Sequence, residues 1–229
     1  MYKDIKLLKR SENLENKFSK VSIEDKLENN RLFPLGVDEV IKYCSSFPIV
    51  ISGKENPEFV FFIGLSKEKN PLILNKNLEE PRFLQNYPFL MVDAKNEEDN
   101  YVEVLAYDDN KKYVNQNEDI PFFIDDKTIS NQMQEKINSL RELQQKRKIS
   151  KIIIKELQDK DLLIKQSFNV KIDGKIINIL KEYYIINRPK LSQIDDATLA
   201  LWAKKGWMGI IDAHTYSLRN FKTLVDIIK

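Results

Sequence analysis

The longest regular pattern in the chain is a helical one in its second half. Apolar residues recur there at intervals of four, four and three positions, a spacing that places them on one face of a helix. They are Ile129, Met133, Ile137 and Leu140. The stripe resumes at 152–157, after the polar run 144–148, where the helix is expected to kink or to cross solvent. The pattern predicts a long helix over 129–157, with Asp126 or Thr128 as its N-cap.

Two segments in the first half share one order of patterns. Residues 37–65 and 81–107 each contain a short helical pattern, an aromatic-Pro step, a strand, a turn and a second strand. The steps end at Pro48 and Pro88, and proline ends a helix while it is tolerated at the first position of a strand. We expect an internal repeat of antiparallel hairpins backed by short helices. Chance similarity between only two copies is the alternative.

A further hairpin is predicted in the second half. The β-prone runs 167–172 and 175–180 flank Asp173-Gly174, a pair that favours a type I′ turn because both central residues need a positive φ. Residues 183–186 extend the second strand or add a third one. Antiparallel strands are therefore expected in both halves of the chain.

Helices are predicted at the C-terminal end. Asp195 or Asp196 caps the start of a helix that ends at Gly206. A final helical pattern covers 208–228, either as one helix or as two that meet near Ser217.

The remaining segments have weaker patterns. Residues 5–8 are expected to start an edge strand, and 13–31 to form a surface connection. Residues 108–127 are expected to form a polar loop with one apolar anchor at 120–124. The predicted fold class is α+β, with antiparallel β-hairpins packed against a long central helix and C-terminal helices. It is expected to form a single domain over 1–229.

Length and charge narrow the classes of function. A chain of 229 residues with 42% hydrophobic content can bury a sizeable core. Its 37 basic and 35 acidic residues nearly balance, which argues against a dedicated nucleic-acid binder. The single cysteine, Cys44, cannot form an internal disulfide, and no run approaches the roughly 18–20 apolar residues of a membrane span. A soluble cytoplasmic protein without a signal peptide is expected.

The rarest side chains gather near the C-terminus. Both tryptophans, Trp202 and Trp207, lie there with the only histidine, His214. Asp212 and Ser217 do not complete a catalytic triad with His214, because such a triad needs convergent groups from separate elements. Residues two apart on a helix also do not face each other. One histidine and one distant cysteine do not suit a zinc site.

Two interpretations of this stretch remain open. In the structural one, a neighbour bonds the ring nitrogens of His214 and both indoles fill the core. In the functional one, four side chains form a binding site. They are Trp207, Asp212, His214 and Tyr216. No catalytic residue, metal ligand or cofactor site is predicted, because the chain has no G-x-G-x-x-G and no Lys-Ser/Thr phosphate loop.

Other polar and thiol groups receive structural interpretations. The acidic stretch 97–99 and the pair Asp108-Asp109 lack the alternation and the closing glutamate of an EF-hand loop, so both are expected to be solvated. The basic residues of 146–155 form a helical patch that glutamates dilute, and it is expected to face solvent. Cys44 is expected to be a small core residue.

Together these motifs resemble the SapC family, which is named for a bacterial surface-array (S-layer) protein locus. The resemblance spans nearly the whole chain and rests on six short motifs. They are Phe47-Pro48-Ile49-Val50, Tyr87-Pro88-Phe89, Asp173-Gly174, Gly206-Trp207, Ala213-His214 and Ser217-Leu218. Many members have an arginine just before the Tyr-Pro-Phe step, where this chain has Gln85-Asn86, so the resemblance implies no anion-binding arginine here.

The resemblance implies no established activity, cofactor or catalytic residue. Two functions of different classes follow from it and from the residues. The first is an accessory protein that binds a protein or peptide partner and supports the expression or export of surface-layer proteins, with strand edges that accept an extended segment. The second is an enzyme, or an enzyme subunit, that acts on a small molecule or peptide around His214.

Overall fold

The computed structural model describes most of the chain. The described residues are 2–27, 30–53, 55–64, 70–96, 98–172 and 175–226. The chain divides into two compact units. Unit 1 comprises 1–30 and 80–144, and unit 2 comprises 31–79 and 145–229. The fold is α+β with antiparallel sheets, which confirms the predicted class.

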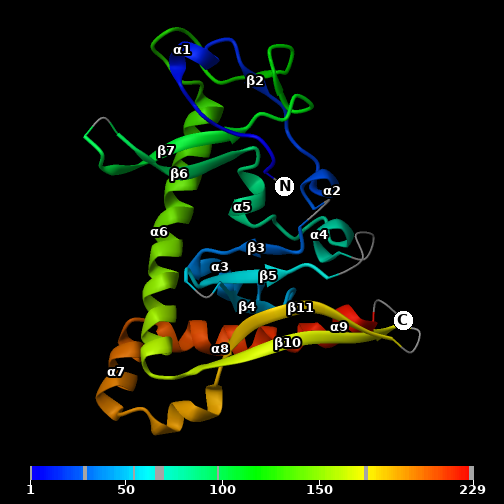
Figure 1. Cartoon of the computed structure of the whole chain (residues 1–229), viewed down its shortest axis with the longest axis vertical. Helices are drawn as coiled ribbons and strands as arrows, with labels where there is room; N and C mark the ends of the chain where they lie inside the picture. Colours follow the sequence, from blue (N-terminus) through cyan, green and yellow to red (C-terminus); the bar gives the residue numbers. More distant parts are fainter. Residues whose placement is uncertain are drawn as a thin grey trace. The chain divides into compact units, whose positions relative to one another are not determined.

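Unit 1 contains two small antiparallel sheets. Their strands are β1 (Ile5–Leu7), β2 (Lys17–Phe18), β6 (Phe89–Lys95), β7 (Tyr101–Asp108), β8 (Val114–Asn115) and β9 (Ile120–Pro121). Among the described residues, the strand orders are β1-β7-β6 and β8-β2-β9. Figure 1 shows β6 and β7 side by side. The β6–β7 hairpin pairs Phe89 with Tyr107 and Lys95 with Tyr101. β1 lies at a sheet edge, as the sequence predicts.

Two segments of unit 1 are more ordered than the sequence predicts. The first, expected as a surface connection over 13–31, contains β2 and α2 (Ile23–Lys26), and α1 (Arg10–Asn13) ends at its first residue. The second, expected as a loop, contains β8 and β9, which both pair with β2. Strands of two residues are too short to show a period, so the pattern along the chain could not reveal them.

Aromatic rings dominate the core of unit 1. Phe18 and Phe89 meet edge-to-face with their ring centroids 4.8 Å apart, and Phe89 also contacts Phe122 at 5.3 Å. Edge-to-face pairs add stability beyond the area that they bury. Met133 and Leu140 pack on these rings from the long helix, as the predicted apolar stripe requires.

The long helix α6 (Asn131–Asp159) confirms the predicted element over most of its length. Its N-cap is Ser130, and not Asp126 or Thr128. The hydroxyl of Ser130 accepts a hydrogen bond from the backbone N–H of Met133 at 3.2 Å. The prediction was wrong because the preceding residues form a turn of their own, in which the Asp125 carboxylate accepts two backbone N–H bonds. The helix is continuous through its polar run, where unit 1 ends and unit 2 begins.

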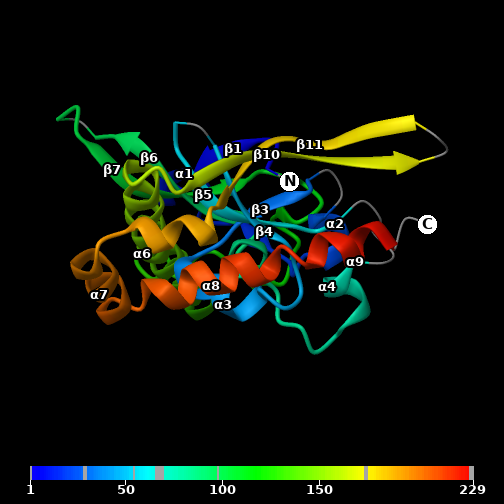
Figure 2. The same ribbon diagram turned by 90° about the horizontal axis from the view of Figure 1, so that it is seen from below.

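Unit 2 is built on a larger antiparallel sheet. Its strands are β3 (Leu32–Pro34), β4 (Ile49–Ser52), β5 (Glu58–Phe62), β10 (Leu163–Ile172) and β11 (Lys175–Ile186). Their order among the described residues is β10-β11-β4-β5-β3. Residues 183–186 extend β11, as one of the two predicted alternatives has it. Among the described residues, β11 pairs with β4 at one position, where Tyr184 lies opposite Ile51. The rest of the β10–β11 hairpin extends as two strands (Figure 2). The predicted turn at Asp173-Gly174 lies outside the described residues.

Helices complete both units. Of the helices not yet named, α5 (Arg82–Gln85) belongs to unit 1, and the others belong to unit 2. These others are α3 (Val37–Tyr43), α4 (Pro71–Leu74), the 3₁₀ helix η1 (Arg188–Gln193), α7 (Asp196–Lys204), α8 (Trp207–Ser217) and α9 (Asn220–Asp226). The final helical pattern is thus two helices that meet after Ser217. Among the described helices, none combines the length and hydropathy that a membrane crossing requires.

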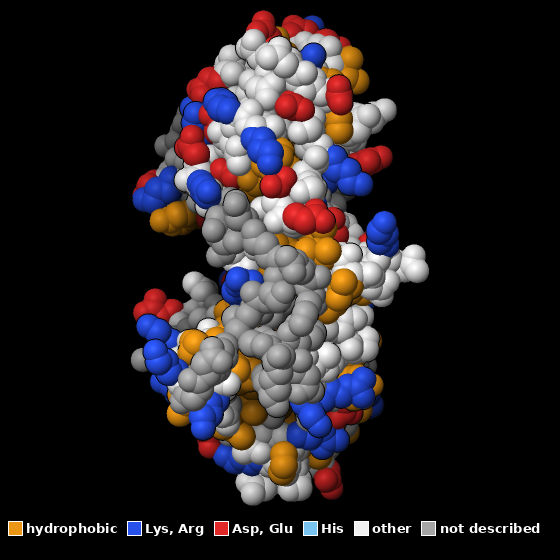
Figure 3. Space-filling model, turned by 90° about the vertical axis from the view of Figure 1, so that its right-hand side faces the viewer, with side chains coloured by type: hydrophobic (Ala, Val, Ile, Leu, Met, Phe, Trp, Pro, Cys, Tyr) orange, Lys and Arg blue, Asp and Glu red, His pale blue; other side chains and the backbone are white. Residues whose placement is uncertain are grey.

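The two segments with similar patterns each contain a helix followed by an antiparallel strand pair. These are α3, β4 and β5 in unit 2, and α5, β6 and β7 in unit 1. The internal repeat and the single-domain organisation stay predictions. Figure 3 shows acidic and basic side chains interspersed over the face that it presents.

Candidate functional site

The C-terminal stretch begins with two capped helices. The Asp195 carboxylate accepts a hydrogen bond from the backbone N–H of Thr198 at 2.9 Å, which fixes the start of α7. Gly206 has a φ of +73°, a left-handed conformation that favours glycine after a helix end. Trp202 is buried, and Trp207 is half-buried with its ring centroid 6.3 Å from that of Trp202. The two indole rings therefore pack against each other where α7 meets α8.

His214 faces the interior of unit 2. Its exposed fraction is 0%, and its ring lies 6.1 Å from the ring of Phe59 on β5. Neither ring nitrogen has a hydrogen-bond partner among the described residues, so the expected bonding neighbour is not found there. Burial lowers the pKa of the imidazole to about 3, because the charged form loses its hydration. The ring is therefore neutral at physiological pH.

Asp212 and Tyr216 lie on the opposite, exposed side of α8. The Nε–H of Arg188 donates to the Asp212 carboxylate at 2.8 Å. The Arg219 guanidinium lies 3.5 Å from the centroid of the Tyr216 ring, which is 46% exposed. The structure therefore does not bring these side chains together with His214, which points inward.

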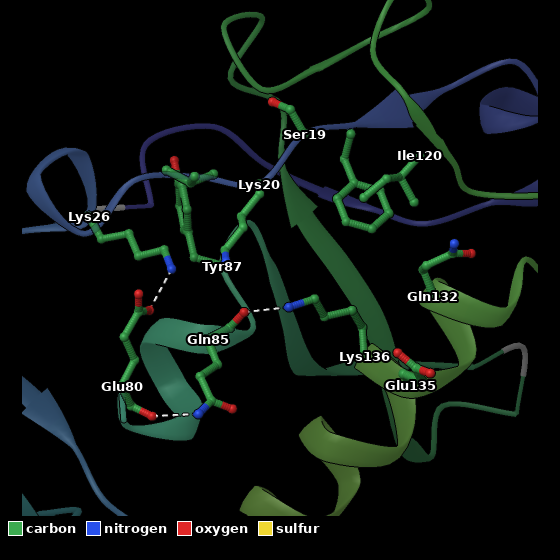
Figure 4. A pocket seen from close by; sticks show the side chains of 12 residues that line it. Ser19, Lys20, Lys26, Glu80, Gln85, Tyr87, Ile120, Gln132, Glu135 and Lys136 are labelled. Carbon is green, nitrogen blue, oxygen red and sulfur yellow. Dashed lines mark hydrogen bonds and ion pairs between the residues drawn. The ribbon is translucent and has the colours of Figure 1, made fainter. Parts of the chain in front are cut away.

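A cavity of about 400 Å³ lies in unit 1, where no motif indicated a site (Figure 4). Its lining comes from the β2–α2 segment, the α5 region, β9 and the first turns of α6. The apolar part of the lining is Phe18, Val21, Tyr87 and Ile120. The polar part includes Lys20, Lys26, Glu80, Gln85 and Lys136. The cavity thus combines an aromatic and aliphatic wall with several ammonium groups.

Two of these lysines are held inside the unit. Lys26 is 4% exposed, and its ammonium group lies 2.6 Å from the Glu80 carboxylate. The ammonium group of Lys136 donates to the backbone carbonyl of Gln85. The pKa of Lys136 is lowered, first because burial removes water from the charged form and then because Lys26 is close. An anion placed beside Lys136 would act in the opposite direction, because it would stabilise the charged form.

Tyr87 links the cavity wall to a buried carboxylate. Its hydroxyl donates to Asp108 at 2.6 Å, and the other carboxylate oxygen accepts the backbone N–H groups of Lys3 at 3.1 Å and Asp4 at 2.9 Å. Burial raises the pKa of Tyr87, and the bond to Asp108 adds to this effect. The expectation of a solvated acidic pair was wrong, since Asp108 is 1% exposed and Asp109 is 7% exposed. These carboxylates anchor the N-terminal segment.

Other sequence candidates have structural contacts. Cys44 is half-buried after the end of α3 and donates to the carbonyl of Ile41, so it is not the core residue expected. Arg147 of the basic patch lies 2.6 Å from the Glu58 carboxylate and is half-buried, so this residue does not face solvent freely. In the acidic stretch, residues 98 and 99 are exposed, and residue 97 lies outside the described part.

The lysines of the cavity escaped the sequence analysis for a clear reason. Lys136 lies between Met133 and Ile137, and Lys26 directly precedes Leu27, which is fully buried. A lysine at the border of an apolar stripe is a weak signal, because long side chains often bury their stems and keep the charge in water. The partner at Glu80 is far away in the sequence, so only the fold reveals the pair.

Comparison with protein families identifies the family of this chain. The family model for SapC matches residues 15–224 of the 229. The chain belongs to the SapC family. No curated protein and no solved structure matches it. In the described part of this SapC chain, no group of three or more His, Cys, Asp or Glu side chains is placed to hold a metal ion.

Proposed function

We propose that this SapC chain is a cytoplasmic accessory protein that binds an extended segment of a partner protein. The partner is a protein that takes part in the expression or export of surface-layer proteins. The family is named for a locus that encodes such a protein. The observation that carries the proposal is the edge of β10 that has no neighbouring strand in the described part of the chain. Binding by strand addition needs such an edge, and it needs no catalytic group.

β10 offers a long edge for pairing. It pairs with β11 from Leu163–Ile186 to Ile172–Lys175, and it has no second neighbour among the described strands. An edge strand presents unpaired backbone N–H and C=O groups, which an added strand can satisfy. Five of its side chains are exposed. They are Lys165, Gln166, Ser167, Asn169 and Lys171.

The core of unit 2 holds this edge in place. The ring of Phe168 lies 4.6 Å from that of Phe221 on α9 and 6.1 Å from that of Phe62 on β5. Val170 is also buried. A strand that is already ordered loses little conformational entropy when a partner binds, which favours affinity. Exposed lysines on both strands of the hairpin favour a partner segment with acidic side chains.

The C-terminal stretch supports a structural role better than an enzymatic one. His214 is neutral, and its carbonyl accepts the Ser217 hydroxyl at 2.6 Å. That hydroxyl also accepts the backbone N–H of Ile49 at 3.0 Å, so it ties α8 to β4. Asp212 is likewise paired with Arg188, so Ser217 and Asp212 are both engaged in contacts within unit 2. We therefore assign no reaction to His214.

The proposal predicts a covalent adduct at the β10 edge. A photo-crosslinking amino acid in place of Asn169 should capture a partner in native cells several-fold more efficiently than one in place of Lys151. Both positions are exposed in unit 2, but Lys151 lies on α6. Mass spectrometry of the adduct should identify a surface-layer protein or an export component. Equal yields at both positions, or an adduct with neither class of protein, would count against the proposal.

A further inference from the structure

We infer that the cavity of unit 1 binds a small organic carboxylate. Its charged group lies beside Lys136, and its apolar part lies against Phe18 and Ile120. The inference is independent of the β10 edge, because every lining residue belongs to unit 1. It concerns a ligand site that no catalytic or binding motif in the sequence indicated.

Three ammonium groups converge on this cavity, two from the β2–α2 segment and one from α6. The side chains of Lys20, Lys26 and Lys136 extend toward the same space, with Gln85 beside it (Figure 4). Lys26 is buried and Lys136 is half-buried. Opposite charges attract more strongly where water is excluded. Bringing cations together in this way costs free energy that a bound anion would recover.

Lys136 is the group best placed to receive the carboxylate. Its ammonium group donates to the neutral carbonyl of Gln85, and within the described chain it has no carboxylate at ion-pair distance. By contrast, Lys26 already has Glu80 as its partner. An ammonium–carboxylate bond is about twice as strong as one to a neutral acceptor. A ligand carboxylate would therefore stabilise the ammonium group of Lys136 and leave the Lys26–Glu80 ion pair intact.

The balance of charges favours a monoanion. Three lysines line the cavity together with two glutamates, Glu80 and Glu135. One net positive charge remains, which matches a carboxylate better than a phosphate dianion. The two glutamates would also repel the second charge of a phosphate.

The rest of the lining favours an apolar body on the ligand. Phe18, Val21 and Tyr87 are buried, and Ile120 is half-buried. Pockets for small molecules combine such walls with a few polar groups that fix orientation, and they occupy about 300–1,000 Å³. The cavity volume of about 400 Å³ lies in this range. A free organic acid and the C-terminus of a peptide with an apolar last residue share this chemistry.

Titration of the full chain tests the inference. The first pair of probes is 4-phenylbutyrate and its neutral amide. The second pair is a tetrapeptide that ends in phenylalanine, as the free acid and as the amide. Calorimetry measures the affinity of the chain for each probe. We expect an acid to bind at least about tenfold more tightly than its amide, because a hydrogen bond between charged groups is lost. Tighter binding by 4-phenylbutyrate identifies a free organic acid as the source, and tighter binding by the peptide identifies a C-terminus.

A matched pair of variants locates the site. Lys136→Met keeps the apolar stem and removes the charge, so it should reduce acid binding about tenfold, while Lys136→Arg should retain it. Lys127→Met removes an exposed lysine of unit 1 that does not line the cavity, and it should bind as the wild type does. Circular dichroism verifies that each variant is folded. Equal affinity for acid and amide, no binding of either acid at millimolar concentration, or unchanged binding by folded Lys136→Met would overturn the inference.

Discussion

A His214→Leu variant is expected to resist acid better than the wild type, by about 2 kcal/mol at pH 5. The pKa of His214 is about 3 in the folded chain against an ordinary value of 6.5. Between these values the unfolded chain binds a proton that the folded chain does not, so stability falls as the pH falls. The loss is about 1.4 kcal/mol per pH unit below 6.5, and it approaches about 5 kcal/mol below pH 3. Above pH 6.5 the contribution is fully present.

Urea unfolding at pH 7, 6 and 5 measures this effect. The difference between wild type and His214→Leu isolates the histidine, because both chains share every other titrating group. At pH 7 the two should differ little, since an apolar side chain of similar volume replaces a ring whose nitrogens have no partner among the described residues. Tyr216→Leu, on the exposed side of the same helix, should follow the wild type at every pH. Parallel curves for wild type and His214→Leu would show that the ring gains a proton or a partner in the folded chain.

The elements that the sequence predicted correctly depend on local signals. The stripe from Met133 to Leu140 repeats with the period of a helix, and the helix follows from that period alone. The turn at Gly206 is predicted because few residues other than glycine tolerate its positive φ. The β10–β11 hairpin follows from two β-prone runs of matching length around a turn pair.

The elements that the sequence missed depend on partners far along the chain. β2 becomes a strand only because β8 and β9 pair with it. Lys26 is buried because Glu80 lies beside its ammonium group, and Asp108 is buried because it accepts N–H groups of the N-terminal segment. Charged residues are ordinarily solvated, so composition and spacing predict exposure at each of these positions. The cavity escaped prediction because its lining comes from four separate segments.

The candidate site shows the same division. The sequence located the rare residues near the C-terminus. The rarity of a residue, however, does not determine whether its side chain faces the core or the solvent. Asp212 and Tyr216 are four positions apart and share the exposed side of α8, while His214 lies between them and points inward. The period of a helix predicts that Asp212 and Tyr216 lie on one side of the helix and His214 on the other. It does not predict which of the two sides faces the core.

The Asp108→Ala variant is expected to lose about 3–5 kcal/mol of unfolding free energy. The carboxylate accepts the hydroxyl of Tyr87 and the backbone N–H groups of Lys3 and Asp4. Its removal leaves three donors without this acceptor, of which the Tyr87 hydroxyl is buried and the two backbone N–H groups are part-buried. A buried donor left unpaired costs about 1–3 kcal/mol. Water entering the vacated space reduces the sum. Urea unfolding measures the loss, and hydrogen exchange of residues 3 and 4 should become faster.

Two further variants distinguish the buried bonds from the loss of a charge. Asp108→Asn keeps one acceptor oxygen for the two N–H groups and an amide that can donate to the Tyr87 oxygen, so it should cost about 1 kcal/mol. Asp93→Ala removes an exposed carboxylate from β6 and should change stability by less than about 0.5 kcal/mol. If Asp108→Ala were as stable as Asp93→Ala, Asp108 would not anchor the N-terminal segment. If Asp108→Asn were as damaging as Asp108→Ala, the charge itself, and not the set of hydrogen bonds, would hold β1 beside β7.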